Sequence, residues 1–393
     1  MTWFTCTPVS FSGGPAFFCR DSGLVCKGIQ SLGLSCKSVM PLPVHPGEIT
    51  ADLIRTDAKN LARHEWWRDI GASNVVLYSW AHYKYRKIAE AIRDSGAKLF
   101  INLDGSGIMS PRVTPSLYLG AIMGKQVRQH GPILGALTGA LRSIAYRFYI
   151  PIVQEPGRIA HLKTATAIGC ITPGALALWR LWALTYAPEL AERMHVVPNP
   201  VADYIKYDSA VAKQDMCIAI GRWDDEEPKR PALLAATIAE ALHRRATTEF
   251  HIYGNPGRIL PDWHINLPGH IRKRVYLHGG VSHKELLNAL MCSRIGLCSS
   301  SHEGSHVASE EALCAGASIV APFRRELNAM LWYVSHDSGQ LSVEDSARGL
   351  AETLLLELAA WDHGDRDPVS ISSYWCSKLS ATAVARKIQK LLL

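Results

Sequence analysis

Short apolar runs alternate along this chain with longer stretches whose apolar residues recur at helical spacing. Runs of about four to eight apolar residues are typical of buried strands, and longer stretches with a period of about 3.6 residues indicate helices. The alternation occurs in two successive series, separated by a polar and poorly periodic stretch at 202–215. Strands are predicted at 3–7, 34–40, 74–79, 98–102, 167–172 and 195–201 in the first series, and at 216–221, 248–253, 275–278, 294–298 and 318–321 in the second.

Helical spacing places helices between most of these strands. They are predicted at 21–32, 83–95, 173–186, 232–244, 282–291, 342–359 and 377–392. Strands alternating with helices form parallel sheets covered on both faces, so the sequence predicts an α/β fold of two doubly wound, Rossmann-like domains with a cleft between them. The predicted parts are a first domain at 1–200, a linker at 201–215, a second domain at 216–372 and a C-terminal crossover helix at 373–393.

The composition is that of an ordinary folded protein, with 48% hydrophobic and 20% charged residues. The net charge of +7 is unevenly distributed, because residues 1–200 carry 21 basic and 12 acidic side chains (+9) whereas residues 201–393 carry 21 and 23 (−2). A basic first half suggests an anionic partner, either a phosphorylated acceptor or a membrane surface. A nucleic-acid partner is not expected.

The ten cysteines form no CxxC pair and no recurring spacing, so neither a structural zinc site nor a disulfide framework is expected. The N-terminus lacks the basic start and the apolar core of a secretory signal. No uncharged apolar run approaches the length of a membrane span. A reduced, cytoplasmic protein is therefore expected.

A glycine-rich loop, Ser12 to Pro15, follows the first predicted strand and precedes a predicted helix. Glycines such as Gly13 and Gly14 let the backbone approach an anion at a helix N-terminus, which is how a phosphate-binding turn is built. The alternative is a turn that only connects two elements. Two later strands of this series end in polar residues, His82 and Asp104, and each is either a catalyst facing the cleft or a structural residue of its loop.

Residues 105–154 contain no aspartate or glutamate. An apolar stripe recurs in this segment at helical spacing, with tyrosines nearby, and a basic amphipathic helix of this kind can bind an anionic membrane surface. The same stripe would also result from packing into the core of the first domain, and the sequence leaves both interpretations open. The stripe is Leu134, Leu137, Leu141, Ile144 and Phe148, the basic residues are Arg112, Lys125, Arg128, Arg142 and Arg147, and the tyrosines are Tyr146 and Tyr149.

Arg222 directly follows the first strand of the second series, and Lys229 lies seven residues later. Two cations on a strand-end loop suit a diphosphate, because they neutralise the charge that develops on a departing phosphate group. The acidic residues between them are also typical of a solvated, charged loop. Asp224 and Asp225 are adjacent and point in different directions, so a metal site is not expected there.

The stretch 299–316 lies between the last two predicted strands and contains a literal match to HExxH in His302, Glu303 and His306. In zinc peptidases that pattern holds the metal from two histidines one helical turn apart, which requires all five residues to lie in a helix. A strand and three serines come directly before the match, with Gly304 in its middle. These neighbours argue against a helix there and therefore against zinc.

A second interpretation places the start of a helix near Ser305 and its end at Gly316, in the left-handed conformation that glycine adopts after a helix. The backbone N–H groups of 304–307 would then point at an anion, with Glu303 held at the turn and Glu311 further along the helix. Strand, turn, helix and strand form a βαβ unit, which places this turn at the ligand-binding edge of a parallel sheet.

Several segments occur in the order and spacing of a known enzyme family. They are Val196-Val-Pro-Asn199, Gly221-Arg222 with Lys229, His251-Ile-Tyr-Gly254, Val275 to Val281, and Glu303-Gly304 with Glu311 to Gly316. In these segments the chain resembles glycosyltransferase family 4, whose members are retaining, nucleotide-sugar-dependent enzymes of the GT-B fold. The resemblance is specific from residue 196 to about residue 360, and before that it rests on Ser12 to Pro15 and the strand order.

The resemblance implies a role for each matched residue. Glu303 would contact the donor sugar near the reacting carbon, Glu311 would hydrogen-bond the ribose hydroxyls, and Asp104 stands as a candidate catalytic residue where relatives often have a histidine. The donor diphosphate would be held by Arg222 and Lys229 with backbone groups of Gly13, Gly14, Gly304, Ser305 and His306, and the base would lie near Gly254 and Val281.

The chain departs from the family pattern in two places. Glu303-Gly-Ser-His306 replaces the usual Glu-Gly-Phe-Gly, so the sugar pocket is expected to differ. The gap between Arg222 and Lys229 is also longer than usual.

The mechanism implied by the resemblance is front-face transfer, in which the leaving phosphate oxygen helps to deprotonate the acceptor hydroxyl. The expected donor is a UDP- or GDP-linked sugar, the expected acceptor is a glycan, a glycolipid or a lipid-linked saccharide, and no metal is expected. The alternatives are a sugar-nucleotide epimerase on the same fold and, more remotely, a zinc hydrolase that uses His302, Glu303 and His306. The expected location is the cytoplasm, at the inner face of the membrane if residues 105–154 bind lipid.

Overall fold

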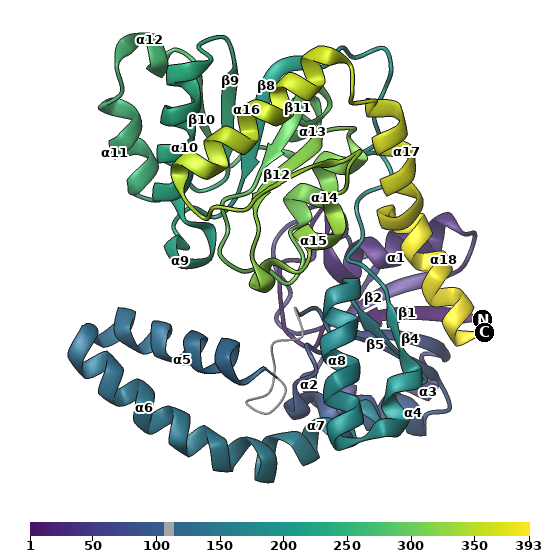
Figure 1. Ribbon diagram of the computed structural model, residues 1–393. Helices are drawn as coiled ribbons and strands as arrows, with labels where there is room; N and C mark the ends of the chain where they lie inside the picture. The colour runs from purple at the N-terminus through teal and green to yellow at the C-terminus, as the bar shows by residue number, and fades with distance from the viewer. Residues whose placement is uncertain (106–113) are drawn as a thin grey trace. The chain divides into compact units, whose positions relative to one another are not determined.

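The computed structural model describes residues 1–105 and 114–393, apart from the side chains of residues 117, 118, 121, 128 and 151. Its contacts divide the chain into two compact units, Met1–Pro200 with Val384–Leu393, and Val201–Ala383. Each unit contains one parallel sheet covered by helices (Figure 1), which confirms the predicted α/β fold with two Rossmann-like domains.

The sheet of the first unit has the strand order β3-β2-β1-β4-β5-β6-β7, and its described pairings are all parallel. The order reverses at β1, as it does in Rossmann folds. Its strands are β1 (Thr2–Cys6), β2 (Cys36–Pro41), β3 (Leu53–Thr56), β4 (Ala72–Tyr78), β5 (Lys98–Asn102), β6 (Ala167–Cys170) and β7 (Met194–Val196).

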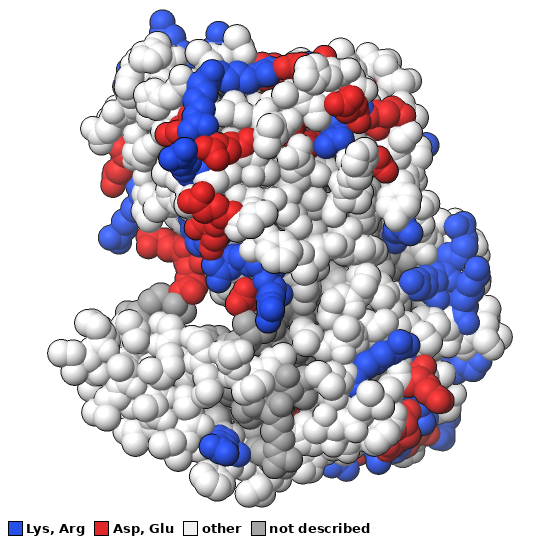
Figure 2. Space-filling view, viewed as in Figure 1, with Lys and Arg blue, Asp and Glu red and all other residues white. Residues whose placement is uncertain are grey.

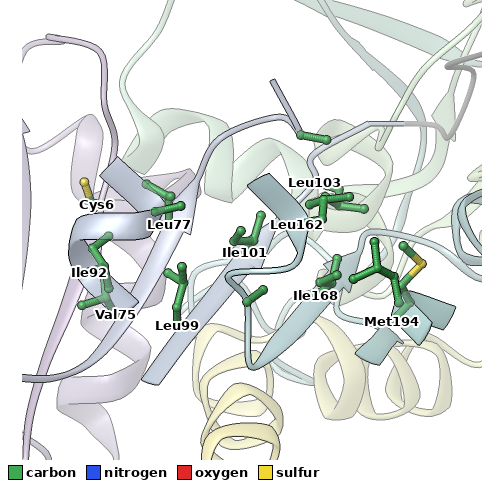
Figure 3. Close-up of a cluster of buried hydrophobic side chains, with 14 of the residues drawn as sticks. Cys6, Val75, Leu77, Ile92, Leu99, Ile101, Leu103, Leu162, Ile168 and Met194 are labelled. Atoms are coloured by element: carbon green, nitrogen blue, oxygen red, sulfur yellow. The ribbon is translucent and has the colours of Figure 1, made fainter. Parts of the chain in front are cut away.

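Both faces of this sheet are buried, because successive side chains of a strand point to opposite faces. Val75, Leu77 and Leu99 pack in one core cluster, which Figure 3 shows in close-up. Val76 and Tyr78 alternate with the first two residues along β4 and pack in a second cluster. The first unit therefore has a core on each side of its sheet.

Helices supply the other side of each core. The shorter elements of the first unit are η1 (Phe17–Cys19), α1 (Asp21–Ser31), α2 (Ala58–Leu61), α3 (His64–Asp69), η2 (Tyr83–Tyr85), α4 (Arg86–Asp94), α7 (Glu155–Leu162), α8 (Pro173–Tyr186) and η4 (Pro188–Arg193). Helix α18 (Ala381–Leu392) ends the chain, and its buried residues Val384, Ala385, Ile388 and Leu392 join the second core cluster of the first unit. The predicted return of the C-terminal helix to the first domain is thereby confirmed.

A long helical hairpin connects β5 to α7 in the first unit (Figure 1). It consists of α5 (Pro115–His130), α6 (Pro132–Tyr149) and a π-helical turn, η3 (Ile150–Gln154), with Gly131 at φ +80° between the two helices. Gly135 and Gly139 allow the two helices to approach closely, since a Cβ at Gly135 would lie 2.3 Å from the Cα of Val127. No helix in the described part of the chain is both long and apolar enough to cross a membrane.

The sheet of the second unit has the order β10-β9-β8-β11-β12-β13, again with parallel pairings. Its strands are β8 (Gln214–Ile220), β9 (Glu249–Tyr253), β10 (Val275–Gly279), β11 (Ser293–Leu297), β12 (Ser318–Pro322) and β13 (Gly339–Ser342). Its helices are α9 (Glu226–Lys229), α10 (Pro231–Arg244), α11 (Ile259–Ile265), α12 (Gly269–Arg272), α13 (His283–Cys292), α14 (Val307–Cys314), η5 (Arg325–Leu327), α15 (Met330–Tyr333), α16 (Ala347–His363) and α17 (Pro368–Leu379).

Two of the predicted helices have different bounds in the structure. The helix predicted at 342–359 begins only at Ala347, because β13 occupies 339–342, and the helix predicted at 377–392 is broken at Ser380 between α17 and α18. The stretch predicted as a linker, 201–215, is part of the second compact unit, where the Tyr207 N–H donates to the carbonyl of Cys314 at 3.2 Å.

Candidate functional site

The carboxyl ends of the strands in the second unit gather the predicted donor residues at one edge of the sheet. Arg222 follows β8, Gly254 follows β9, Val281 follows β10 and Glu303 follows β11. Because the strands are parallel, these positions share an edge, and in open α/β sheets this is the edge that binds ligands. Topology alone therefore collects residues that are up to 81 positions apart in the sequence, counted from Arg222 to Glu303.

Lys229 and Glu303 form an ion pair at this edge, with 2.5 Å between Nζ and Oε1. Ser300 Oγ donates to the same carboxylate oxygen at 2.8 Å. Both charged side chains are mostly buried, at 13% and 15% exposed. Burial alone would raise the pKa of Glu303, but the charge that His306 carries below its own pKa, the charge of Lys229 and these hydrogen bonds outweigh it, so the pKa is lowered. Glu303 is therefore held as a carboxylate.

The turn before α14 has the geometry of an anion site. The helix begins at Val307, two residues later than predicted, and its N-cap, His306, makes no side-chain capping hydrogen bond. Within the described residues, no acceptor is found for the backbone N–H groups from Gly304 to Ala308. Unpaired N–H groups at the positive end of a helix dipole favour a bound anion.

His306 itself is buried beside this turn, and its Nδ1 lies 2.7 Å from Ser309 Oγ. Burial, followed by the charge of Lys229, lowers the pKa of His306 to about 4. The imidazole is therefore neutral at neutral pH. A neutral ring lets the turn accept an anion through its backbone without adding a second cation to Lys229.

The HExxH match does not have the helix that zinc chemistry requires. Residues 302–306 lie in the turn before α14, and His302 Nδ1 contacts Ser301 Oγ at 2.9 Å. No group of three or more histidine, cysteine or acidic side chains in the described residues is arranged to hold a metal ion. The two histidines are not one helical turn apart, and the zinc interpretation loses its structural basis.

Glu310 and Glu311 are adjacent on α14, but their carboxyls meet different surroundings. Glu310 accepts hydrogen bonds from Ser305 Oγ at 2.7 Å and from the hydroxyl of Tyr333. Glu311 is 7% exposed, and no described residue donates a hydrogen bond to its carboxyl. Burial, and secondarily the charge of Glu310, raise the pKa of Glu311 to about 8. The carboxyl of Glu311 is thus buried without a hydrogen-bond donor among the described residues.

Arg222, the other predicted diphosphate ligand, is 78% exposed and pairs with Asp225 at 3.4 Å. Arg230, which the sequence did not single out, is instead built into the site. Its guanidinium donates to the carbonyls of Ser299 at 2.7 Å and Ser300 at 3.3 Å. The only sequence signal for Arg230 was its position next to Lys229.

Two of the three serines before Glu303 hold its loop against the α9 turn, and the third, Ser300, donates to Glu303 itself. Ser299 Oγ donates to the carbonyl of Lys229 at 2.7 Å, and Ser301 Oγ donates to the carbonyl of Glu227 at 3.0 Å. The Ser301 N–H also donates to the carbonyl of Pro228 at 2.7 Å. These bonds place Lys229 opposite Glu303, which explains why three small hydroxyl residues follow β11.

Glycines shape the neighbouring strand ends, where the base is predicted to bind. Gly254 has φ +99°, and a Cβ there would lie 2.0 Å from the carbonyl oxygen of Gly221. Its N–H donates to the carbonyl of Gly279 at 2.7 Å. Only glycine fits at Gly254, because both the conformation and the close backbone approach exclude a side chain. Val281 lies just beyond, before Ser282, which caps α13.

In the first unit, Gly13 is packed against protein rather than presented to solvent. A Cβ at Gly13 would lie 2.1 Å from a Leu53 methyl group. Glu48, paired with Arg55, also accepts a backbone hydrogen bond from Gly13, and Arg55 above all lowers the pKa of Glu48 to about 2. Gly14 carries the following turn, since its carbonyl accepts from the Phe17 N–H at 3.0 Å. The element η1 separates this loop from α1.

Asp104 lies in a left-handed turn after β5, with φ +38°. Its carboxylate accepts hydrogen bonds from Trp80 Nε1 at 3.0 Å and from Asn199 Nδ2 at 2.9 Å. Burial raises the pKa of Asp104 despite these bonds. The side chain helps to line a cavity of about 320 Å³.

His82, by contrast, is exposed and caps η2 by accepting from the Lys84 N–H at 3.2 Å, which is a structural role.

The apolar stripe of the hairpin is exposed, at 54–64% for Leu134, Leu137, Leu141, Ile144 and Phe148. The alternative of core packing is therefore wrong for these residues within their own unit. Lys125, Arg142 and Arg147 are exposed as well. Figure 2 shows the hairpin, at the lower left, as a largely uncharged surface with a basic patch. Arg112 and the side chain of Arg128 lie outside the described residues.

Comparison with known proteins shows a likeness of structure. No protein-family model and no curated protein matches the sequence. The apo form of WaaB, a lipopolysaccharide outer core galactosyltransferase, matches with a TM-score of 0.64 at 12% identity, over 100% of this chain and 99% of its own. HepE (Alr3699) of Anabaena, solved with UDP, matches with a TM-score of 0.63 at 11% identity, over 100% and 99%.

A third structure, a putative UDP-N-acetylglucosamine 2-epimerase from Listeria monocytogenes, matches with a TM-score of 0.57 at 11% identity, over 98% of this chain and 94% of its own. At such low identities the likeness establishes the fold alone. The chain has the GT-B fold, as its sequence predicts.

Proposed function

We propose that this protein is a retaining glycosyltransferase of family 4 that moves a sugar from a nucleotide-diphosphate sugar to a hydroxyl acceptor. The observation that carries the proposal is the anion site at the start of α14, where unpaired backbone N–H groups lie next to the Lys229–Glu303 pair. A site with one cation, one fixed carboxylate and a helix N-terminus suits a sugar diphosphate, which presents two phosphates and a ring of hydroxyls.

The roles of the donor-site residues follow from their surroundings. Lys229 would neutralise the departing phosphate, and the N–H groups of 304–308 would bind its oxygens. Glu303, kept ionised, would accept hydrogen bonds from sugar hydroxyls. The partnerless carboxyl of Glu311 would meet the ribose hydroxyls, which supply the donors that the described residues do not. Arg222 is free to move from Asp225 to the diphosphate, because it is largely exposed.

The donor proposed is a UDP-linked sugar. HepE, which shares the fold, has been solved with UDP and with UDP-glucose. The strand ends at Gly254 and Val281 would receive the base. Backbone groups of Gly14 would add to the diphosphate site, whereas Gly13 is already engaged by Glu48.

Transfer is proposed to occur on the front face of the donor sugar. The acceptor oxygen bonds to the anomeric carbon as the bond from that carbon to the phosphate oxygen breaks, and the acceptor proton passes to the leaving phosphate oxygen. The protein then contributes orientation and charge stabilisation.

A sugar-nucleotide epimerase is the second candidate, and the likeness to the Listeria monocytogenes structure favours it specifically. The two functions differ in their need for an acceptor. Release of nucleoside diphosphate from a UDP-sugar should require a hydroxyl acceptor and should yield a glycoside that keeps the anomeric configuration. Conversion of the sugar nucleotide without any acceptor would identify an epimerase instead.

We also propose that the protein attaches to an anionic membrane surface through residues 105–154, on the cytoplasmic side. The apolar stripe of α6 is exposed, and the surrounding segment carries basic residues and no acidic one. A helix with these properties lies in the plane of the lipid headgroups. Membrane attachment would bring the site to a glycolipid or lipid-linked acceptor.

A further inference from the structure

Two cysteines meet where the C-terminal end of α14 packs against α17. Cys314 is the last residue of α14, and Cys376 lies in α17, 62 positions later in the sequence. The thiol of Cys314 hydrogen-bonds to the sulfur of Cys376. Cys376 Sγ also lies 3.6 Å from the carbonyl oxygen of Cys314. The two sulfurs are therefore neighbours in the folded chain, and both belong to the second unit.

The carbonyl of Cys314 is the point that holds the two helices together here. It accepts a hydrogen bond from Ser372 Oγ at 2.5 Å and another from the Tyr207 N–H at 3.2 Å. Ser372 lies one helical turn before Cys376 on α17, and its hydroxyl is 3.7 Å from Cys376 Sγ. These contacts fix the position of Cys376 relative to Cys314.

The two sulfurs differ in their access to solvent. Cys314 is 0% exposed, whereas Cys376 is partly exposed. A reagent that arrives from solution therefore reaches Cys376 first. Cys314 can react only with the product that forms on Cys376, so the order of the two reactions is set by burial.

The same arrangement separates the acidities of the two thiols. The hydrogen bond from Cys314 is the largest cause that lowers the pKa of Cys376, to about 7, and Ser372 and the charge of Lys206 contribute in the same direction against burial. Burial above all, and then the bond to Cys376, raise the pKa of Cys314 well above its ordinary value. At neutral pH, a large fraction of Cys376 is the nucleophilic thiolate, and Cys314 is a thiol.

Another pair of hydrogen-bonded thiols, Cys26 and Cys36, lies between α1 and β2 of the first unit. Both residues are buried, at 0% and 3% exposed. An oxidant in water has little access to either sulfur, so contact between thiols does not by itself make a reactive pair. The pair at α14 and α17 differs because one of its sulfurs is accessible.

We propose that Cys376 is a modification site for hydroperoxides and that Cys314 converts the product into a reversible disulfide. In the first step the Cys376 sulfur attacks one peroxide oxygen, the O–O bond breaks, a sulfenic acid forms, and the leaving oxygen takes up a proton to give an alcohol or water. In the second step the Cys314 sulfur attacks that of Cys376, the S–S bond forms, the S–O bond breaks, and the hydroxide leaves as water with the Cys314 proton. One hydroperoxide thus accepts the two electrons that the thiol pair loses.

The disulfide would tie α14 to α17 across 62 positions of the chain. A cross-link of this kind stabilises a protein mainly by limiting the freedom of the unfolded chain. Cytoplasmic disulfides are typically transient and redox-sensing, so a reversible bond agrees with the location expected from the sequence. The proposal does not depend on glycosyl transfer.

Peptide mapping of the wild type tests the proposal without any variant. The reduced full-length protein is treated with one equivalent of hydrogen peroxide, alkylated in denaturant and digested without reductant. The peptides that contain Cys314 and Cys376 should appear joined, with a loss of two hydrogens, and dithiothreitol should separate them. Recovery of both cysteines as alkylated thiols, or of either one joined mainly to a different cysteine, would overturn the proposal.

Variants separate the roles of the two sulfurs. Cys314→Ala leaves the sulfenic acid of Cys376 without a resolving thiol, so dimedone should label Cys376 at least about tenfold more than in the wild type once the peroxide is consumed. Cys292→Ala removes another partly exposed cysteine and should form the disulfide as the wild type does. Equal dimedone labelling of the wild type and Cys314→Ala would show that Cys314 does not resolve the sulfenic acid.

Urea unfolding gives a readout that does not depend on mass. The oxidised wild type should unfold at a higher urea concentration than the reduced wild type, because the cross-link restricts the unfolded chain. Cys376→Ser should unfold at the same concentration with and without peroxide. An oxidised wild type that is less stable than the reduced protein would contradict a disulfide that fits the native packing of α14 on α17.

Discussion

Two neighbouring glutamates on α14, Glu310 and Glu311, show how position decides the chemistry of identical side chains. Glu310 accepts hydrogen bonds at Oε1 from Ser305 and Tyr333, and these bonds hold the start of the helix against α15. Glu311 is buried beside it with no hydrogen-bond donor among the described residues. A buried carboxyl without donors favours its protonated form, so Glu311 reduces stability wherever the solution pH would ionise it.

The pKa of Glu311 makes stability pH-dependent in a defined direction. The folded pKa of about 8 exceeds the ordinary value of about 4.3, so between these values the folded state holds a proton that the unfolded state has lost. The free energy of unfolding should therefore fall as the pH rises from about 4 to about 8. Glu311→Gln should remove this fall, worth a few kcal/mol at about 1.4 kcal/mol per pKa unit.

Urea unfolding at several pH values, compared between wild type, Glu311→Gln and the exposed control Glu192→Gln, measures this effect. The wild type and Glu192→Gln should lose stability in parallel. A Glu311→Gln profile parallel to the wild type would show that Glu311 ionises normally in the folded protein.

Lys229 is the residue whose loss should weaken donor binding most directly. Lys229→Met removes the cation that faces the diphosphate and leaves Glu303 with an unbalanced, mostly buried charge. Affinity for UDP should fall about tenfold or more, as expected for loss of a charge-assisted bond. Calorimetric titration with UDP measures the change, and the exposed Lys273→Met serves as the control. Equal affinities of the two variants for UDP would show that Lys229 does not bind the donor.

The sequence predicts Glu303, Lys229 and Glu311 as site residues but does not single out Arg230 or Trp80. The first three matched a spaced pattern in the chain. Arg230 acts on the carbonyls of Ser299 and Ser300, and no side-chain pattern records which carbonyls a loop presents. Trp80 lies in a left-handed turn that brings its indole to Asp104, and the residue type does not favour that turn.

At the scale of elements, hydrophobic periodicity located the central strands well but missed two of the edge strands. β5 and α8 have the predicted bounds, and Gly316 has the expected left-handed conformation at φ +78°. β3 and β13 were missed, since each is a four-residue strand at the edge of its sheet. A strand of four residues has too few apolar positions for an alternating pattern to distinguish it from a loop.

The hairpin is the element whose surroundings the sequence could not decide. Gly135 and Gly139 turn toward α5, and the stripe from Leu134 to Phe148 remains exposed. The spacing of the stripe is the same for a core helix and for a surface helix, because both require one apolar face. Only the position of α5 shows that this face is left uncovered within its unit.

Membrane binding by α6 can be tested by flotation with vesicles of phosphatidylcholine containing phosphatidylglycerol. The wild type should float at low salt and less at high salt, because the screening length falls from about 10 Å at 0.1 M to about 3 Å at 1 M. Leu141→Glu should abolish flotation by placing a charge in the apolar stripe. Leu184→Glu changes an equally exposed leucine on α8 and should float normally.

Flotation of Leu141→Glu at the wild-type level would mean that α6 does not contact lipid. Binding to vesicles of phosphatidylcholine alone, unaffected by salt, would mean that the basic residues are not involved. Either result would contradict attachment of the hairpin to an anionic surface.

At the scale of the whole molecule, the two-domain fold was predictable because each domain repeats the same strand and helix alternation. The return of α18 to the first unit followed from the resemblance and is visible in its buried face. The stretch predicted as a linker contains Tyr207, whose N–H donates to the carbonyl of Cys314. A polar composition does not prevent a segment from packing through its backbone.

The proposed function requires two ligands, a nucleotide-sugar donor and a hydroxyl acceptor. The proposed donor residues Lys229, Glu303 and Glu311 belong to the second unit. The donor site is the central claim, because transfer and epimerisation both require it.

Thermal and urea stability with and without nucleoside diphosphate test that claim most directly. UDP at about a hundredfold over its dissociation constant should stabilise the wild type by about 2.7 kcal/mol. The shift should be lost in Glu311→Ala, retained in Glu192→Ala, and unaffected by a chelator. Absence of a shift with UDP, GDP and their sugar derivatives, or an undiminished shift in Glu311→Ala, would contradict a nucleotide-sugar site at α14.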